Sequence, residues 1–329
     1  MAELADANDS RSFERKLVRV QVSLPAHVKR QQKLLIIVGP TSSGKSALAV
    51  ELARKFNGEV ISADSRQVYR GLDVGTGKIS KREMKGVRHH SLDVASPEKI
   101  FTAHDFVEKG RAAISDIAAR GKLPIVAGGT GFYIDALVGR IALPNVPANK
   151  KLRAQLELKT AKELFAMLKK RDPRRAKSID PHNKRRLVRA LEITAALGRV
   201  PKIMDVAHPY FDTLWIGIAT PQKVLERKIY ARLLSRLRGG MVVEARRLHR
   251  HGLSYKRMEQ LGLEYRALAR YLQGNITRKQ MVDELNRDIR QYAKRQLAYW
   301  KRNKDIKWFK PDNAGRITRE IKDWKAGGR

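Results

Sequence analysis

One octapeptide combines residue types and spacing that suit phosphate binding. Residues 39–46 read GPTSSGKS and match the pattern G-x-x-x-x-G-K-[ST]. The apolar run 34–38 precedes it, and residues 47–56, apolar at helical spacing, follow it, which is the strand, loop and helix that the motif requires. The glycines let backbone N–H groups converge on phosphate oxygens and the lysine adds positive charge. The sequence therefore predicts a diphosphate-binding loop formed by Gly39, Pro40, Thr41, Ser42, Ser43, Gly44, Lys45 and Ser46, with the Ser46 hydroxyl as a Mg²⁺ ligand.

Such a loop is typical of proteins that bind ATP or another nucleoside triphosphate, but a second acid is hard to place. Enzymes that transfer the γ-phosphate usually hold Mg²⁺ with an acid at the end of a second apolar strand. Residues 124–127 lead into Gly128-Gly129-Thr130-Gly131, and residues 214–219 are followed by Thr220. Asp93 is therefore the only candidate for the second acid, and it is a weak one. The pattern favours a diphosphate leaving group over an ATP that is split.

Asp64 follows the apolar segment 59–63, so its side chain is expected at the carboxyl end of a sheet, beside the phosphate loop. It is a candidate general base, and equally a candidate helix N-cap. The glycines of residues 128–131 permit close ligand approach or form a plain turn. His89 and His90 are adjacent and lack the spacing of a helical metal pair, so we expect packing residues and no zinc.

Several Val- and Ile-rich segments must position these residues. Residues 34–38, 59–63, 91–94, 124–127 and 214–219 alternate with helical stretches, which predicts an α/β fold with a parallel, P-loop NTPase-like sheet flanked by helices. Between residues 145 and 207 the pattern changes to charged amphipathic helices, so we expect an all-helical insertion. The core domain then comprises residues 33–144 and 208–329, with further helices at 222–251 and 278–301. Residues 1–32 are predicted to be a mobile leader.

The charge of the chain points to a polyanionic partner. The 329 residues include 69 Lys and Arg against 33 Asp and Glu, a net charge of +36. Residues 1–149 carry 23 basic and 15 acidic side chains, whereas residues 150–329 carry 46 and 18. Such an excess favours nucleic acid through counterion release, although a solvated basic surface is the plain alternative. The second half of the chain is therefore the predicted polyanion surface. Tyr292, Tyr299 and Trp300 are candidates for stacking on bases, and Tyr299 and Trp300 are equally candidates for the core of a terminal helix.

Composition also bears on the compartment. The chain has no cysteine, which fits a reducing environment, and the apolar run 34–38 is too short to cross a bilayer. We therefore expect a cytoplasmic protein without a membrane partner, and a monomer.

Taken together, the motifs resemble those of the tRNA dimethylallyltransferases, the isopentenyltransferase family. The resemblance runs in one order over residues 34–309 and rests on GPTSSGKS at 39–46, ADSRQVYRGLDVGTGK at 63–78, GGTGFY at 128–133, RRLVRALE at 185–192 and QYAKRQLAYW at 291–300. It implies transfer of a dimethylallyl group from dimethylallyl diphosphate to the exocyclic amine, N6, of the adenosine next to the tRNA anticodon on its 3′ side. Diphosphate leaves with the help of Mg²⁺, which accounts for the absent second acid.

The resemblance also assigns roles to residues. Asp64 would accept a proton from the attacking amine, Thr41 would assist catalysis, and residues 41–46 with Arg232 would hold the diphosphate. The implied tRNA contacts are Asp64, Ser65, Arg66, Gln67, Thr130, Arg153, Arg185, Arg186, Leu187, Val188, Arg189, Glu264, Tyr265, Arg266, Lys294, Arg295, Gln296, Leu297, Ala298, Tyr299, Trp300 and Lys301. Two positions depart from the family. Lys228 replaces a common Arg and cannot reproduce bidentate phosphate contacts, and Glu264 replaces a usual Gly and would place a carboxylate near an RNA phosphate.

Three rival functions stay open at this point: prenylation of free adenine nucleotides, as in the adenylate isopentenyltransferases, phosphoryl transfer by a P-loop nucleotide kinase, and RNA binding without catalysis. A small nucleotide acceptor does not require the strongly basic second half, which favours RNA as the acceptor.

Overall fold

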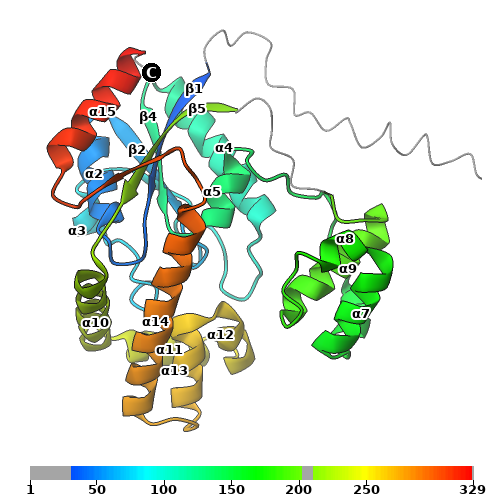
Figure 1. Ribbon diagram of the computed structural model, residues 1–329. Helices are drawn as coiled ribbons and strands as arrows, with labels where there is room; N and C mark the ends of the chain where they lie inside the picture. Colours follow the sequence, from blue (N-terminus) through cyan, green and yellow to red (C-terminus); the bar gives the residue numbers. More distant parts are fainter. Residues whose placement is uncertain (1–30, 202–209, 328–329) are drawn as a thin grey trace, which may run out of the picture. The chain divides into compact units, whose positions relative to one another are not determined.

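The computed structural model describes residues 31–201 and 210–327 (Figure 1). The predicted leader lies outside the described residues except for its last two positions, and Gln32 already belongs to the first strand.

One six-stranded sheet forms the centre of the fold. Its strands are β1 (Gln32–Val38), β2 (Gly58–Ala63), β3 (His89–His90), β4 (Leu123–Gly128), β5 (Phe211–Ile218) and β6 (Ile306–Phe309), in the spatial order β3-β2-β4-β1-β5-β6. The pairs β1–β4, β2–β3, β2–β4 and β5–β6 are parallel. The predicted parallel α/β fold is confirmed. Because β2, β4 and β1 are adjacent and parallel, the segments that follow these three strands meet at the carboxyl end of the sheet, the usual location of a ligand site.

Alternation along β1 divides the core into two layers. Leu34, Ile36 and Val38 face α4 (Ala103–Ala119), α5 (Gly131–Leu137) and the end of α14 (Arg278–Trp300). Leu35 and Ile37 face α2 (Lys45–Lys55) and α15 (Ala314–Ala326). All five side chains are fully buried, as expected for a strand covered on both faces. The two helical layers are visible in Figure 1.

A helical segment follows β5. The helices α10 (Gln222–Arg238), α11 (Met241–Arg250), α12 (Tyr255–Leu261) and α13 (Leu263–Leu272) pack with α14 around a core that also includes Val68 and Leu72. Residues 222–251 were predicted to be helical throughout, and the structure differs in one respect. The segment forms two helices, α10 and α11, separated at Gly239 and Gly240. Gly240 has a φ of 93°, which glycine adopts without a Cβ clash.

The expected helices between 145 and 207 are present as α6 (Lys150–Glu157), α7 (Ala161–Arg171), α8 (Pro173–Ala176) and α9 (Lys184–Leu197), and residues 202–209 lie outside the described residues. The four helices share a hydrophobic cluster of their own that includes Leu164, Leu168, Leu187 and Leu191. Side chains of Asn149, Thr160, Asp172 and Asn183 cap the four helices.

The strand predicted at 91–94 is wrong. The strand β3 covers His89 and His90 instead, because Ser91 and Asp93 adopt positive φ angles of 63° and 56° and turn the chain away from the sheet. The short helix α3 (Lys81–Met84) lies before β3. Within the described ranges, none of the helices is long and apolar enough to cross a membrane.

Candidate active site

The phosphate loop connects β1 to α2 and leaves the N-terminus of α2, the positive end of the helix dipole, without a side-chain cap. Gly39 and Gly44 have φ angles of 152° and 98°, and a Cβ on Gly39 would lie 2.9 Å from the Ser43 hydroxyl. Helix α2 starts at Lys45 with Gly44 as N-cap, without a side-chain cap and without an acid in its first turn. Since the first N–H groups of a helix attract anions, this start is suited to phosphate oxygens.

Two cations lie close to this helix start. The Lys45 ammonium donates to the Pro40 carbonyl at 3.1 Å, and Arg232 of α10 donates to the Gly77 carbonyl at 2.8 Å. Burial lowers the pKa of Lys45 to about 8, Asp64 acts against this shift, and Arg232 adds to it. Desolvation also lowers the pKa of Arg232, and Asp64 is among the carboxylates that oppose that shift. Lys45, Arg232 and Asp64 therefore interact electrostatically as one cluster.

Asp64 projects from the end of β2. Its Oδ1 accepts from the backbone N–H of Arg66 at 2.8 Å and of Gln67 at 3.3 Å, which fixes the carboxylate in a turn and not at a helix N-terminus. Within the described residues, Oδ2 accepts none of the hydrogen bonds found, and the residue is half-buried. One oxygen orients the group while the other is available to take a proton.

The glycines of 128–131 have packing reasons that the sequence did not reveal. Gln296 of α14 accepts from the Thr41 N–H at 2.8 Å and donates to the Gly129 carbonyl at 3.0 Å. A Cβ on Gly129 would lie 2.1 Å from the Gln296 amide, and one on Gly131 would lie 2.2 Å from the Tyr299 ring. These glycines let α14 approach closely, and Gln296 ties the phosphate loop to the loop after β4.

Thr130 connects the same loops. Its hydroxyl accepts from the Ser65 N–H at 3.1 Å, and it also hydrogen-bonds with the half-buried Tyr292. Burial, followed by the nearby Asp64, raises the pKa of Tyr292, which keeps the phenol neutral. Tyr292 therefore lies close enough to Asp64 for the two side chains to interact electrostatically, a placement that no signal in the sequence indicated.

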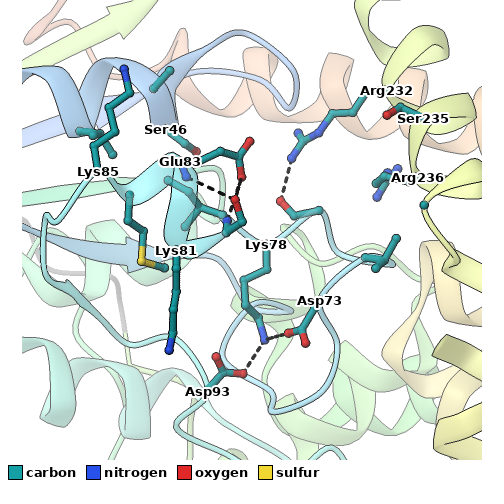
Figure 2. A pocket seen from close by; sticks show the side chains of 18 of the residues that line it. Ser46, Asp73, Lys78, Lys81, Glu83, Lys85, Asp93, Arg232, Ser235 and Arg236 are labelled. Atoms are coloured by element: carbon teal, nitrogen blue, oxygen red, sulfur yellow. Dashed lines mark hydrogen bonds and ion pairs between the residues drawn. The ribbon is translucent and has the colours of Figure 1, made fainter.

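A cavity of about 1270 Å³ opens from the phosphate loop. It is lined by the first turn of α2 at Ser46, by residues within the segment 73–85 and by α10, and Figure 2 shows the Lys78 side chain directed toward Asp73 and Asp93. Neither Asp64 nor Lys45 lines the cavity, but both interact with Arg232, which does. Asp93, the weak candidate for a Mg²⁺ ligand, is 2.5 Å from the Lys78 ammonium and is therefore already paired.

The donor groups here fit Mg²⁺, which needs few protein ligands when substrate phosphates supply the others. The Ser46 hydroxyl is exposed at the cavity wall and Asp64 offers a hard carboxylate oxygen. Within the described ranges there is no group of three or more acids and histidines that could hold a metal alone. The adjacent histidines of β3 have other partners, since His90 pairs with Glu59 at 2.8 Å and His89 hydrogen-bonds with the Val87 carbonyl at 2.9 Å.

The residues expected to contact RNA fall into two groups. In the core domain, Arg266, Lys294, Arg295, Ala298 and Lys301 are exposed, while Ser65, Arg66, Gln67, Leu297 and Tyr299 are half-buried. Tyr265 and Trp300 are each 1% exposed, and Trp300 packs at 6.1 Å from the Trp215 ring. These two side chains support the exposed ones around them and do not face solvent.

In the insertion, Arg185 and Arg186 are exposed at the start of α9, whereas Leu187 and Val188 lie in its core. Arg153 and Arg189 both pair with Glu192, which is 1% exposed, at 2.8 and 2.5 Å. Their guanidinium groups are held by this buried carboxylate, so only their remaining N–H groups can reach a phosphate.

Sequence reasoning missed Glu244, a carboxylate of α11 that is 5% exposed and accepts backbone hydrogen bonds from residues 73–75. It matched none of the motifs, although it lies three positions after the buried Met241 and therefore on the buried face of α11.

Comparisons with known proteins identify the family of the chain. Residues 67–303 match the family model described as IPP transferase. The tRNA dimethylallyltransferase of Leuconostoc citreum is 39% identical, with 89% of this chain and 99% of the relative covered. The tRNA dimethylallyltransferase 2 of Treponema denticola is 42% identical over 82% of this chain and 91% of the relative.

Two solved structures share the fold. The full-length tRNA isopentenylpyrophosphate transferase of Bacillus halodurans has a TM-score of 0.67 and 36% identity, covering 90% of this chain and 96% of that one. A eukaryotic dimethylallyltransferase described as acting on tRNA has a TM-score of 0.79 and 26% identity, covering 91% and 80%.

Proposed function

Since the chain belongs to the IPP transferase family, we propose that it is a tRNA dimethylallyltransferase. It transfers a dimethylallyl group from dimethylallyl diphosphate to N6 of the adenosine on the 3′ side of the anticodon. One observation carries the proposal. At the carboxyl end of the sheet, the phosphate loop leads into a helix without a side-chain cap, and the Asp64 carboxylate, with one oxygen available, interacts with Lys45 and Arg232.

The site supports a substitution at carbon with these residues. The amine lone pair attacks C1 of the dimethylallyl group, the C1–O bond breaks, and its electron pair stays with the diphosphate. Lys45, Arg232 and the N–H groups of the loop stabilise the charge that develops on the leaving oxygens. Mg²⁺, held by Ser46 and the diphosphate, would add to this stabilisation. The Asp64 carboxylate takes the proton released from the amine.

Adenine in a stacked loop is not accessible to Asp64, so the base must leave its stack. Exposed cations of the core domain, namely Arg266, Lys294 and Arg295, and the exposed Arg185 and Arg186 of the insertion can contact RNA phosphates. A free nucleotide would need none of these side chains, which is why tRNA is preferred over AMP as the acceptor.

The test is incubation of the full chain and Mg²⁺ with labelled dimethylallyl diphosphate and either unmodified tRNA or AMP. Label is expected in the tRNA, and digestion should recover it as N6-dimethylallyladenosine. Preferential labelling of AMP would indicate an adenylate isopentenyltransferase, and transfer of ATP γ-phosphate a kinase. RNA binding with label in neither acceptor would remove the transferase assignment.

A further inference from the structure

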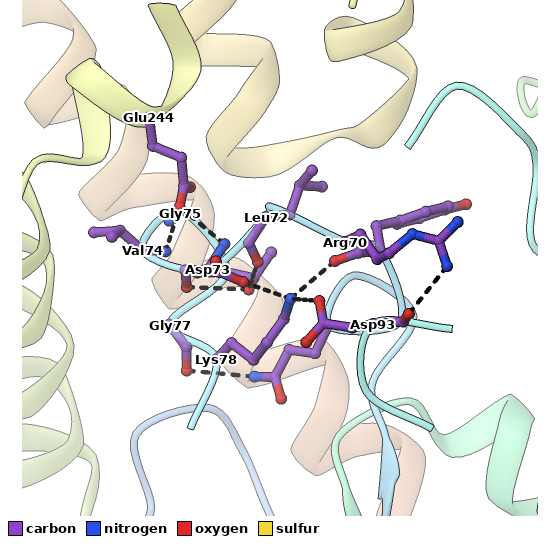
Figure 3. A network of polar contacts seen from close by, with 12 residues as sticks. Arg70, Leu72, Asp73, Val74, Gly75, Gly77, Lys78, Asp93 and Glu244 are labelled. Atoms are coloured by element: carbon purple, nitrogen blue, oxygen red, sulfur yellow. Dashed lines mark hydrogen bonds and ion pairs between the residues drawn. The ribbon is translucent and has the colours of Figure 1, made fainter. Parts of the chain in front are cut away.

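The Glu244 carboxylate holds the loop of residues 73–77, and Asp73, Val74 and Gly77 of this loop line the cavity. Oε2 accepts from the N–H groups of Asp73 at 2.9 Å and Val74 at 2.8 Å, and Oε1 accepts from the N–H of Gly75 at 2.8 Å and the Tyr265 hydroxyl at 2.6 Å. Figure 3 shows the carboxylate facing the loop backbone. Four donors thus converge on one buried charge, which is a costly arrangement unless it is fully satisfied.

The opposite side of the same loop holds two arginines of α10. Arg236 donates to the Gly75 carbonyl at 2.7 Å and Arg232 to the Gly77 carbonyl at 2.8 Å. Four residues separate them, so both lie on one face of the helix. The loop therefore turns its N–H groups to an anion and its carbonyl groups to two cations.

Two glycines make this double contact possible. A Cβ on Gly75 would lie 2.6 Å from the Tyr265 hydroxyl and 3.1 Å from the Glu244 carboxylate. Gly77 has a φ of 59°, and a Cβ there would lie 2.6 Å from the Arg232 guanidinium. The loop is thus fitted closely between the carboxylate and the arginines, and its position is determined by both.

From this geometry we infer that Glu244 is a positioning residue for donor binding, acting through the loop on Arg232. The inference rests on the proposed function, in which Arg232 contacts the diphosphate. One Arg232 N–H is used by the Gly77 carbonyl, and a guanidinium has five. The remaining donors point correctly only while Gly77 stays in place, and Gly77 stays in place because residues 73–75 are fixed on Glu244.

The test variant is Glu244→Gln, which keeps the side-chain size but leaves one acceptor oxygen for four donors. The KM for dimethylallyl diphosphate should rise about tenfold or more, since bonds to a buried charge are lost, while kcat changes less than about threefold. The Kd for tRNA should stay within about twofold, because the residues that face RNA are not in this loop.

Glu59→Gln is the matched control. Glu59 is a carboxylate 2% exposed at the start of β2, bound by Arg120, Lys122 and His90. This variant should lower Tm without changing the donor KM. An equal rise of the donor KM in both variants would mean general destabilisation and overturn the assignment. If Glu244→Gln does not fold, Tyr265→Phe removes one of the four donors alone, and an unchanged donor KM in that variant overturns it as well.

A double-mutant cycle separates this inference from the proposed function. Arg232→Ala should itself raise the donor KM, and adding Glu244→Gln to it should raise the KM less than about twofold further. Additive effects would overturn the link through Arg232 and leave the transferase intact. An unchanged KM in Arg232→Ala would remove Arg232 from the diphosphate and Glu244 from its role, even if prenylated tRNA still forms.

Discussion

Gln296→Ala is expected to damage donor binding and stability together. Its amide joins the Thr41 N–H of the phosphate loop to the Gly129 carbonyl across the end of the sheet, and the residue is 6% exposed. The substitution removes both hydrogen bonds and leaves two backbone groups without partners in a space that water enters poorly.

The magnitude follows from these two bonds. A hydrogen bond contributes about 1 kcal/mol net, and a buried partner left unsatisfied costs about 1 to 3 kcal/mol. Two groups are affected, so the free energy of unfolding should fall by roughly 2 to 6 kcal/mol. For a chain of 329 residues, whose unfolding entropy is about 0.7 kcal/mol/K, this corresponds to a Tm lower by about 3 to 9 °C.

The assay measures thermal unfolding and the donor KM, with Gln291→Ala as control. Gln291 is exposed on the same helix, so its truncation should alter neither value. We expect the Gln296 variant to show a several-fold higher KM for dimethylallyl diphosphate, because Thr41 and the loop that follows it lose their anchor. A Gln296→Ala enzyme with wild-type Tm and donor KM would refute the bridging role.

Three further outcomes are expected. Asp64→Asn should lower kcat at least about a hundredfold while the tRNA Kd changes little, because a general base is removed without altering the RNA surface; an active variant would exclude Asp64 as the base. Arg185→Ala with Arg186→Ala should weaken tRNA binding and reduce the slope of log K against log salt by up to about 2, whereas an unchanged slope would assign these residues to a solvated surface. The pKa of Lys45 near 8 means that the ammonium is charged below that pH and neutral above it, so kcat/KM for the donor should fall as pH rises through about 8. Lys45→Arg should abolish this decrease, and its persistence would assign the titration to another group.

The parts of the site that depend on local sequence were predictable. A glycine-rich loop between a strand and a helix has one arrangement that suits an anion, and residues 39–46 adopt it at the positions expected. Asp64 could be placed at the sheet edge because it directly follows a buried strand. The alternation of buried side chains in β1 likewise follows from a strand covered by helices on both faces.

Contacts between distant segments were not predictable. Gln296 is 255 positions from Thr41, and Glu244 is about 170 positions from the loop that it holds. The need for glycine at 75, 129 and 131 depends on side chains that arrive from these later helices, so the turn pattern alone left it open. The strand expected at 91–94 failed for the same reason, since Asp93 turns toward Lys78 and not along the sheet.

The charges around the cavity are distributed so that only some of the cations have a carboxylate partner. Arg236 is paired with Glu264 at 3.1 Å, and Lys78 with Asp73 at 2.6 Å, so the charge of each is balanced by a carboxylate within the protein. Lys45 and Arg232 instead donate to backbone carbonyls, which leave their charge uncompensated by a direct ion pair among the described residues.

This distribution explains the departure at position 264. The Glu264 side chain is 14% exposed and its carboxylate serves as the counterion of Arg236, so it is not oriented toward an RNA phosphate. With glycine at 264, Arg236 would keep its full charge beside Arg232, and a second free cation would draw the diphosphate away from the helix start of α2. Neutralising Arg236 therefore concentrates the positive potential at Lys45 and Arg232, next to the carboxylate that must accept the proton.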